Sequence, residues 1–301
     1  MFQYVRSGHW HFPFAPADLG VYPLANGQTY GGGETSEEDQ QPVEESGNML
    51  IMTAALAQLG HASSITDKYW PVLTTWAEYV RKNGRDPGRQ VCTDDFAGPM
   101  AHNANLSLKA IEALAAYAYL CKLRGDETNA EAYLQTAKSY AADWVKMSND
   151  GDHSRLAFDQ PGTWSQKYNL VWDKILGFDL FPKEIARREV DYYKQQELAF
   201  GFPLDSRHAY TKLDWETWSA SLTGSRSDFD ELMTPVYNFV NKSRLRVPLC
   251  DWYEADIGEP RIAVYDSGRV LSFRARPVVG AVFIRMLYEP SIRKKWFSQT
   301  E

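Results

Sequence analysis

Basic residues are not in excess in this 301-residue chain, which has 32 Lys and Arg against 39 Asp and Glu and a formal net charge of −7. An acidic balance argues against nucleic acid or an anionic membrane surface as a partner. No apolar run approaches the roughly 20 residues of a membrane span. Residues 1–12 have neither the basic start nor the apolar core of a signal peptide. We therefore expect no nucleic acid and no membrane span, and a small-molecule substrate.

Cysteine is scarce as well. The chain has three cysteines, an odd number without metal-type spacing: Cys92, Cys121 and Cys250. Neither a disulfide framework nor a zinc site is therefore indicated. The Gly-rich run 31–34 is not followed by the Lys-Ser/Thr pair of a phosphate-binding loop. We expect no metal and no other cofactor. No Ser/Gly-rich or charged linker divides the chain, which predicts one domain over residues 1–301.

The dominant pattern is a series of paired helices at a repeat of roughly 50–60 residues. In each pair the first helix is apolar or rich in small residues nearly all round, and the second is a charged amphipath. This alternation is typical of stacked helical hairpins with a buried inner ring and a solvated outer one. The predicted pairs are 43–60 with 64–83, 102–125 with 127–149, 167–181 with 183–199, and 213–224 with 227–243, followed by a last apolar helix at 276–288.

The connections favour a closed ring over an open solenoid, which would have the same repeat. Connections into the apolar helices are long and polar, whereas those between partners are short. The longest, 11–34, is rich in Pro, Gly and aromatic residues, and loops of such length are usually functional or disordered. Strand signals are limited to two short candidate ribbons, 200–210 and 262–268. We therefore predict an all-α ring of helical hairpins with its elaborate loops at one end.

Polar and aromatic groups introduce each apolar helix. Pro42 suits a first helical turn, and Glu44 and Glu45 follow it where the helix dipole favours negative charge. In a closed ring such groups would converge on one cavity, the usual place for a site. The others are Asp94, Asp95, His102 and Asn103 before the second apolar helix, Trp164, Lys167, Tyr168, Asn169 and Asp173 at the third, and Arg207, Asp214, Trp215, Glu216 and Trp218 at the fourth.

Several of these groups also have a purely structural interpretation. Asp94 or Asp95 could cap a short helical turn, and Asn103 and Asp214 could cap the helices that follow them. The acids of the first predicted helix could be ordinary first-turn acids. Asp173 differs, because a carboxylate inside an apolar helix needs a partner or a raised pKa. It is therefore either held by Lys or Arg, or used.

Three chemistries fit this set of side chains. Two carboxylates across a cavity, one protonated and one ionised, can hydrolyse a glycosidic bond or, equally, an amide. Nucleophilic attack by Cys92 or Thr93 with help from His102 is the third, and no nucleophile-elbow motif supports it. His102 could instead be a hydrogen-bonded structural histidine, and Lys167 could be a surface residue.

Six long and irregular stretches then carry a resemblance over nearly the whole chain: FAPADLGVYPLANGQTYGGGE, PVEESGNML, TDDFAGPMAHNANLSLKAI, WSQKYNLVWDKILG, GFPLDSRHAYTKLDWETW and FRARPVVGAVFIRML. Through them the chain resembles the glutaminase A family in its six-helical-hairpin domain. The resemblance implies an (α/α)6 toroid akin to the six-hairpin glycosidases, an extracytoplasmic location and release of ammonia from L-glutamine. Family members are longer, with an N-terminal β-rich portion and opening helices, so it also implies a domain truncated at its N-terminal side.

The first hypothesis is a hydrolase of the glutamine side-chain amide, in which one carboxylate activates water and another protonates the leaving nitrogen. The predicted bases are Glu44, Glu45, Asp94 and Asp95, and the predicted acids are Asp214 and Glu216. The predicted substrate-binding residues are Asn103, Trp164, Tyr168, Asp173, Arg207, Trp215 and Trp218. Of these, Arg207 would hold the α-carboxylate of the substrate and Asp173 its ammonium.

Two other hypotheses remain open. A glycoside hydrolase would use the same carboxylates, with Trp164, Trp215 and Trp218 as platforms for a saccharide. A cleft open at both ends would favour that function, whereas a closed and strongly charged pocket would favour an amino acid. A catalytically silent helical module would instead show exposed apolar surface where further helices should pack, together with inactivity on every substrate.

Overall fold

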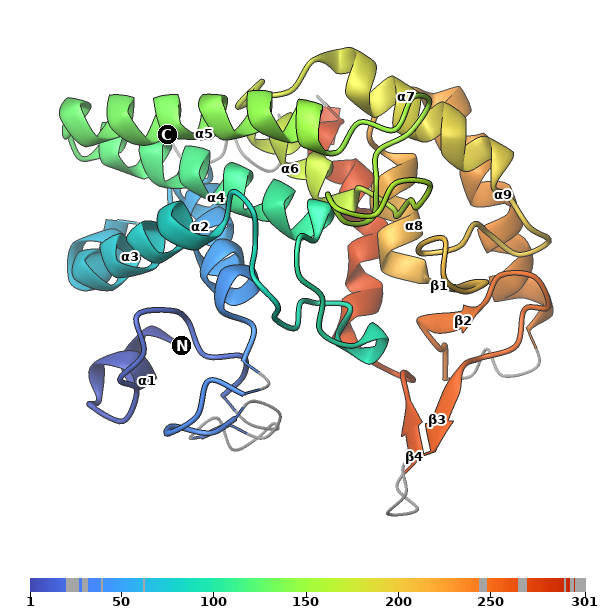
Figure 1. The fold of residues 1–301 in the computed structure, drawn as a ribbon, viewed down its shortest axis with the longest axis horizontal. Helices are drawn as coiled ribbons and strands as arrows, with labels where there is room; N and C mark the ends of the chain where they lie inside the picture. The colour runs from blue at the N-terminus through green and yellow to red at the C-terminus, as the bar shows by residue number, and fades with distance from the viewer. Residues whose placement is uncertain are drawn as a thin grey trace.

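The structure is a computed structural model that describes residues 1–19, 27–28, 32–38, 40–61, 63–243, 248–264, 270–289, 291–292 and 295. These described residues form a series of helices with four short strands (Figure 1). In chain order they are α1 (Phe2–Arg6), α2 (Pro42–Gln58), α3 (Ser63–Asn83), η1 (Asp95–Ala97), α4 (Ala104–Leu123), α5 (Glu127–Met147), η2 (Tyr168–Leu170), α6 (Val171–Leu176), α7 (Lys183–Gln195), β1 (Tyr210–Lys212), α8 (Leu213–Ala220), α9 (Arg226–Lys242), β2 (Trp252–Glu254), β3 (Ile262–Val264), β4 (Val270–Ser272) and η3 (Pro277–Tyr288).

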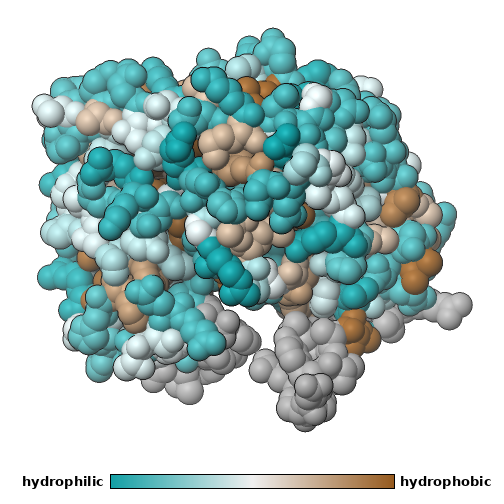
Figure 2. All heavy atoms as spheres, in the orientation of Figure 1, coloured by the Kyte–Doolittle hydropathy of each residue, from teal (hydrophilic) through white to brown (hydrophobic). Residues whose placement is uncertain are grey.

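The inner and outer helices alternate as the sequence predicts, and the fold is an all-α toroid of helical hairpins. The inner set is α2, α4, η2 with α6, α8 and η3. Successive members of this set contact one another, and α6 also reaches both α2 and η3. The outer set is α3, α5, α7 and α9, and Figure 1 shows α5 running alongside α4. Most of the surface in this view is hydrophilic, with apolar residues in small separate patches (Figure 2).

The pair of α4 and α5 shows how the sequence produces this arrangement. Every residue of α4 from Ala104 to Ala118 is buried, as its nearly continuous apolar and small side chains require. Asn103 begins the helix, because its side-chain oxygen accepts from the backbone N–H groups of Asn105 and Leu106. The neighbouring α5 buries a single stripe, and Trp144 on that stripe donates its indole N–H to the Ala104 carbonyl at 2.7 Å.

The third predicted hairpin departs from expectation. The helix predicted over 167–181 ends at Leu176, where Gly177 adopts a left-handed conformation with φ 69°. Asp173 then accepts the backbone N–H groups of Leu180 and Phe181, which turns the chain toward α7. The inner member of this hairpin is therefore short, and a groove separates it from α7.

The first and last inner helices leave apolar side chains uncovered. On α2, Met52 and Leu56 are 49% and 38% exposed, and on η3, Phe283 and Met286 are 63% and 44% exposed. This is apolar surface of the kind that the silent-module hypothesis names. η3 occupies the position of the predicted last apolar helix, 276–288, and is a 3₁₀ helix.

The strands form two antiparallel ribbons, β1 with β2 and β3 with β4. β1 begins where the first candidate ribbon, 200–210, ends, and β3 covers the start of the second, of which residues 265–268 lie outside the described part. Within the long connection 11–34, residues 20–26 and 29–31 also lie outside it. Among the residues described, none of the helices has the length and apolar character needed to cross a membrane.

Candidate functional site

The candidate site lies where the N-terminal ends of α2, α4, η2 and α8 meet the short turn η1; we call this region the rim. At its centre is Asp94, which precedes η1. The Tyr168 hydroxyl donates to Asp94 Oδ2 at 2.8 Å, and the Trp215 indole N–H donates to Oδ1 at 3.1 Å. The two aromatic rings are stacked with centroids 4.2 Å apart. Three distant segments thus converge on one carboxyl group.

Asp94 is half-buried, and its environment suits proton transfer. It occupies the cap position of η1 but its side chain makes no capping hydrogen bond, so the capping interpretation is wrong for this carboxylate. Burial raises the pKa of the Asp94 carboxyl to about 7; the Tyr168 hydrogen bond acts in the opposite direction, and the charges of Glu44 and Asp205 add to the rise. A carboxyl that titrates near neutral pH can act as a general base or acid.

Glu44 is held by an inner-helix lysine. Lys109, from α4, donates to Glu44 Oε1 at 2.6 Å and to Asn48 Oδ1 at 2.7 Å. Both charged side chains are buried, with exposures of 3% for Lys109 and 2% for Glu44. Gly47 leaves room for the lysine, because a Cβ added there would lie 2.9 Å from Lys109 Cγ. This ion pair joins α2 to α4 beneath the rim.

Glu45 lies beside that ion pair, and its own pKa is shifted. It is half-buried on the first turn of α2. Burial, reinforced by the charge of Glu44, raises the pKa of Glu45 to about 8, against the opposing effects of Lys109 and Asn48. Glu45 is therefore protonated at neutral pH, while its neighbour is paired as an anion.

A cavity of about 20 Å³ adjoins Asp94 and has room for about one water molecule. Its lining includes Asn103, whose side-chain oxygen is already used to cap α4. It also includes Cys92, whose thiol has a pKa raised well above its usual value by burial; nucleophilic chemistry at this cysteine is therefore not supported, since the thiolate is the reactive form. Asp205 and Arg207 complete the charged part of the lining.

Arg207 is not free to bind a substrate carboxylate with both arms. Its Nε donates to Asp205 Oδ1 at 3.0 Å and its Nη2 to Oδ2 at 2.7 Å, a bidentate pair. Nη1 approaches the Ala97 carbonyl at 3.4 Å. The predicted role of Arg207 as the α-carboxylate ligand is therefore corrected: it ties its own loop to η1.

Asp214 also has a structural partner. Lys212 lies 3.0 Å from Asp214 Oδ1 and forms a shorter contact with Asp251, while Arg276 Nε lies 3.4 Å from Asp251 Oδ1. Burial raises the pKa of Asp214, and the charge of Lys212 opposes that rise. Asp214 Oδ2 has no hydrogen-bond partner among the described residues. The side chain is nearly inaccessible, so the predicted catalytic acid is instead part of a buried ion cluster.

Glu216 lies in the interior and not at the rim. Its Oε1 accepts the Phe202 backbone N–H at 2.8 Å, and its Oε2 accepts the Tyr253 hydroxyl. The chain approaches so closely that a Cβ added at Gly201 would lie 2.0 Å from Glu216 Oε1. The prediction of Glu216 as a catalytic acid is therefore not supported, because a substrate cannot reach it.

Two further predicted ligands lie away from the rim cavity. Trp164 is 6% exposed and packs against Tyr192 and Tyr193, so it offers no platform to a saccharide. Asp173, predicted to be either held by Lys or Arg or used, is instead held by backbone N–H groups. Trp218 stays next to the site, with its ring edge-on to Trp215 at 5.0 Å.

The comparisons with known proteins agree with this architecture. A family model described as the glutaminase A six helical-hairpin domain matches residues 1–286. The chain belongs to this glutaminase A family. Glutaminase A of Aspergillus oryzae is 30% identical over 95% of the chain and 40% of its own length. A protein of Arthroderma benhamiae named "Probable glutaminase" is 27% identical over 93% of the chain and 34% of its own length. The chain thus spans less than half the length of these curated relatives.

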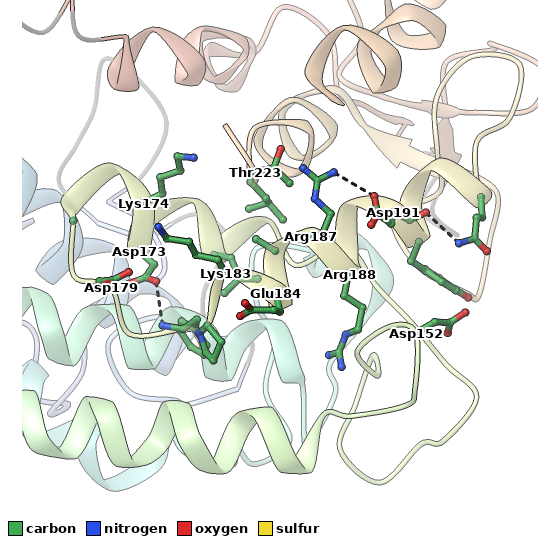
Figure 3. Close-up of a pocket in the computed structure, with 18 residues that line it drawn as sticks. Asp152, Asp173, Lys174, Asp179, Lys183, Glu184, Arg187, Arg188, Asp191 and Thr223 are labelled. Carbon is green, nitrogen blue, oxygen red and sulfur yellow. Dashed lines mark hydrogen bonds and ion pairs between the residues drawn. The ribbon is translucent and has the colours of Figure 1, made fainter. Parts of the chain in front are cut away.

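A much larger cavity, about 1030 Å³, lies at the opposite end of the inner helices of this glutaminase A domain (Figure 3). It is the groove between α6 and α7, and Asp173 is the only predicted site residue that lines it. Of its charged side chains, Arg187 pairs with Asp191 within the lining and with Asp228 outside it. We therefore place the candidate site at the smaller rim cavity, where Asp94 and its partners converge.

Several residues of the site were not predicted. Lys109 carries the one signal that could have found it, since a lysine inside an apolar helix requires a buried partner. Lys167, named among the groups at the third apolar helix with a surface position as the alternative, is fully buried and donates to Ser154 O, Ser165 O and Ser165 Oγ at 3.1, 2.7 and 2.9 Å. Asp251 has no local pattern that distinguishes it from a loop acid, because its partners are remote in sequence.

Proposed function

We propose that this chain is a glutaminase-like hydrolase that releases ammonia from the side-chain amide of L-glutamine. The observation that carries the proposal is Asp94, a half-buried carboxyl with a pKa near 7, held by two aromatic donors beside a water-sized cavity. Two relatives whose names include glutaminase support the amide as the bond that is cleaved.

In this proposal the ionised carboxylate of Asp94 removes a proton from water. The water oxygen forms a bond to the amide carbon, and the carbon–nitrogen bond breaks as the nitrogen receives a proton, giving a carboxylic acid and ammonia. The new acid then returns a proton to the group that protonated the nitrogen, and Asp94 releases its proton to solvent, which leaves the product as a carboxylate. Glu45, which is protonated at neutral pH, is the proposed proton donor to the leaving nitrogen. Two carboxyls whose environments give them different pKa values divide the base and acid roles in this way.

The shape of the rim favours an amino acid over a saccharide. The cavity beside Asp94 is small and bounded by the charged pair Asp205–Arg207. Of the three predicted tryptophan platforms, Trp164 is buried in the core. One face of Trp215 is covered by Tyr168. A glycoside hydrolase needs an open cleft with accessible aromatic faces, and the small cavity beside Asp94 is not such a cleft.

Ammonia release from L-glutamine tests the proposal. Asp94→Asn keeps the size of the side chain but removes the base, so kcat/KM should fall by at least about 100-fold. Asp143→Asn is the matched control, because Asp143 lies on the outer helix α5, pairs with Arg85, and does not line the cavity beside Asp94. Full activity in Asp94→Asn would remove Asp94 from the mechanism. A wild-type chain that cleaves aryl glycosides and leaves glutamine intact would favour the saccharide function.

A further inference from the structure

Arg207 is committed to Asp205, so a different cation must meet the carboxylate of an amino acid substrate. Arg276 is placed to do so. It immediately precedes η3, the last inner helix, and its side chain is 35% exposed. Among the described residues its closest anionic partner is Asp251, with Nε 3.4 Å from Oδ1 and no hydrogen bond formed by Nε. With 35% of this side chain exposed and Asp251 as its one ion-pair partner among the described residues, the guanidinium keeps capacity for a ligand.

The plane of the Arg276 guanidinium is fixed by an aromatic ring. Its Cζ lies 3.9 Å from the centroid of the Phe273 ring, a stacking contact that orients arginine and leaves its N–H groups pointing outward. Phe273 in turn packs edge-on against Phe96 at 5.7 Å. Phe96 follows Asp95 in the turn η1. Through this pair of rings, Arg276 and Asp95 are held on the same side of the rim.

Asp95 is exposed and free of ion pairs within the described part of the chain. Burial of part of the carboxyl raises the pKa of Asp95, and the charges of Arg276 and Lys212 oppose that rise. The opposite charges of Asp95 and Arg276 are therefore close enough to act on each other without forming a direct pair. Asp94, the proposed base, is the adjacent residue in the chain.

We infer that Asp95 and Arg276 bind the α-ammonium and α-carboxylate of a free amino acid, whose side-chain amide then reaches Asp94. The inference rests on the proposed glutaminase function and adds its substrate class: glutamine with both α-groups unblocked. A bidentate, charge-assisted contact with a planar guanidinium selects for a carboxylate over a neutral amide. Glutamine within a peptide chain lacks both charges and is excluded.

Three substrates test this assignment: L-glutamine, its α-amide, which lacks the carboxylate, and Nα-acetyl-L-glutamine, which lacks the ammonium. Arg276→Gln should lower kcat/KM for L-glutamine on the order of 10-fold to 100-fold, mainly through KM. For the α-amide, the kcat/KM of Arg276→Gln should equal that of the wild-type chain. Asp95→Asn should likewise lower kcat/KM for L-glutamine, and its kcat/KM for Nα-acetyl-L-glutamine should equal that of the wild-type chain.

Arg261→Gln is the matched control, because Arg261 also lies over an aromatic ring, that of Tyr210 at 5.2 Å, but is paired with Glu254. Equal losses on L-glutamine and the α-amide, or no loss at all, would overturn the role of Arg276. Thermal unfolding of each variant shows whether it is folded, and Arg276→Lys, which keeps the charge without the planar fork, should give an intermediate KM.

The experiment distinguishes a failure of the proposed glutaminase reaction from a failure of this binding inference. If the wild-type chain releases no ammonia from any of the three substrates, the glutaminase function falls. Calorimetric binding of L-glutamine and of its α-amide to the wild-type and Arg276→Gln chains then tests this inference alone. Binding of L-glutamine that Arg276→Gln removes supports the assignment, and absence of binding to the wild-type chain overturns it.

Discussion

The hydroxyl of Tyr168 and the carboxylate of Asp94 share a hydrogen bond of 2.8 Å across 74 positions of sequence. The bond joins the turn η1 to the start of the third inner helix. Because the donor stabilises the charged form of the acid, it lowers the pKa of Asp94 while burial raises it. The protein thereby sets this carboxyl near neutrality by two opposing effects.

Tyr168→Phe tests this balance through the pH dependence of kcat/KM for ammonia release. In the wild-type chain activity should rise with pH through about 7, as Asp94 ionises, and decline above about 8, as Glu45 loses its proton. Loss of the hydroxyl should move the acidic limb upward by about one pH unit. The alkaline limb should stay in place.

Tyr140→Phe provides the comparison for that profile. Its hydroxyl donates to the Arg81 carbonyl, between outer helices, so its loss should leave both limbs unchanged. An acidic limb that does not move in Tyr168→Phe would show that Asp94 does not control the rate.

The buried pair of Lys109 and Glu44 should dominate the stability of the interface between α2 and α4. Lys109→Met leaves an uncompensated carboxylate in the interior and should lower the free energy of unfolding by about 3–5 kcal/mol. Adding Glu44→Gln removes that charge and should restore part of the loss. Urea denaturation measures both variants. The exposed pair Arg81–Glu78 is the control, since its disruption should cost about 1 kcal/mol or less.

Glu112 should give stability a distinct pH dependence. It is fully buried on α4, neither oxygen has a hydrogen-bond partner in the part of the chain that the structure describes, and burial raises its pKa well above the usual 4.5. The folded chain therefore retains a proton that the unfolded chain releases. This contribution is fully present below about pH 4 and is lost as the pH rises, by at most about 1.4 kcal/mol per pH unit.

Glu112→Gln should remove this slope, because the amide does not titrate. The free energy of unfolding, measured by urea at several values between pH 5 and pH 8, should fall more steeply in the wild-type chain than in the variant. Glu131→Gln, at an exposed position of α5, should reproduce the wild-type slope. Parallel curves for Glu112→Gln and the wild-type chain would show that Glu112 has a partner in solution.

The fold could be predicted where local pattern and tertiary burial agree. α4 was predicted within two residues at each end, because its apolar run and Asn103 cap require no distant information. The inner helix of the third hairpin was predicted too long. Its end depends on how Asp173 engages the backbone of Leu180 and Phe181, a contact that apolar periodicity does not reveal.

The sequence predicts where the candidate site lies better than it predicts the role of each residue there. Asp214, Trp215 and Glu216 are consecutive on a helix, so their side chains point about 100° apart. Trp215 faces Asp94, while its two neighbours turn to buried partners. Sequence places all three at the start of one helix but cannot choose among the directions, since that choice depends on how α8 is rotated against its neighbours.

The enclosure of Lys167 has a practical consequence for following motion in this molecule. Its amine is wrapped by the carbonyl groups of Ser154 and Ser165 and by the Ser165 hydroxyl, so an acylating reagent cannot reach it while those contacts persist. Exposed lysines on the outer helices react without such a delay. The labelling rate of this single amine therefore reports how often the segment around the third inner helix opens to solvent.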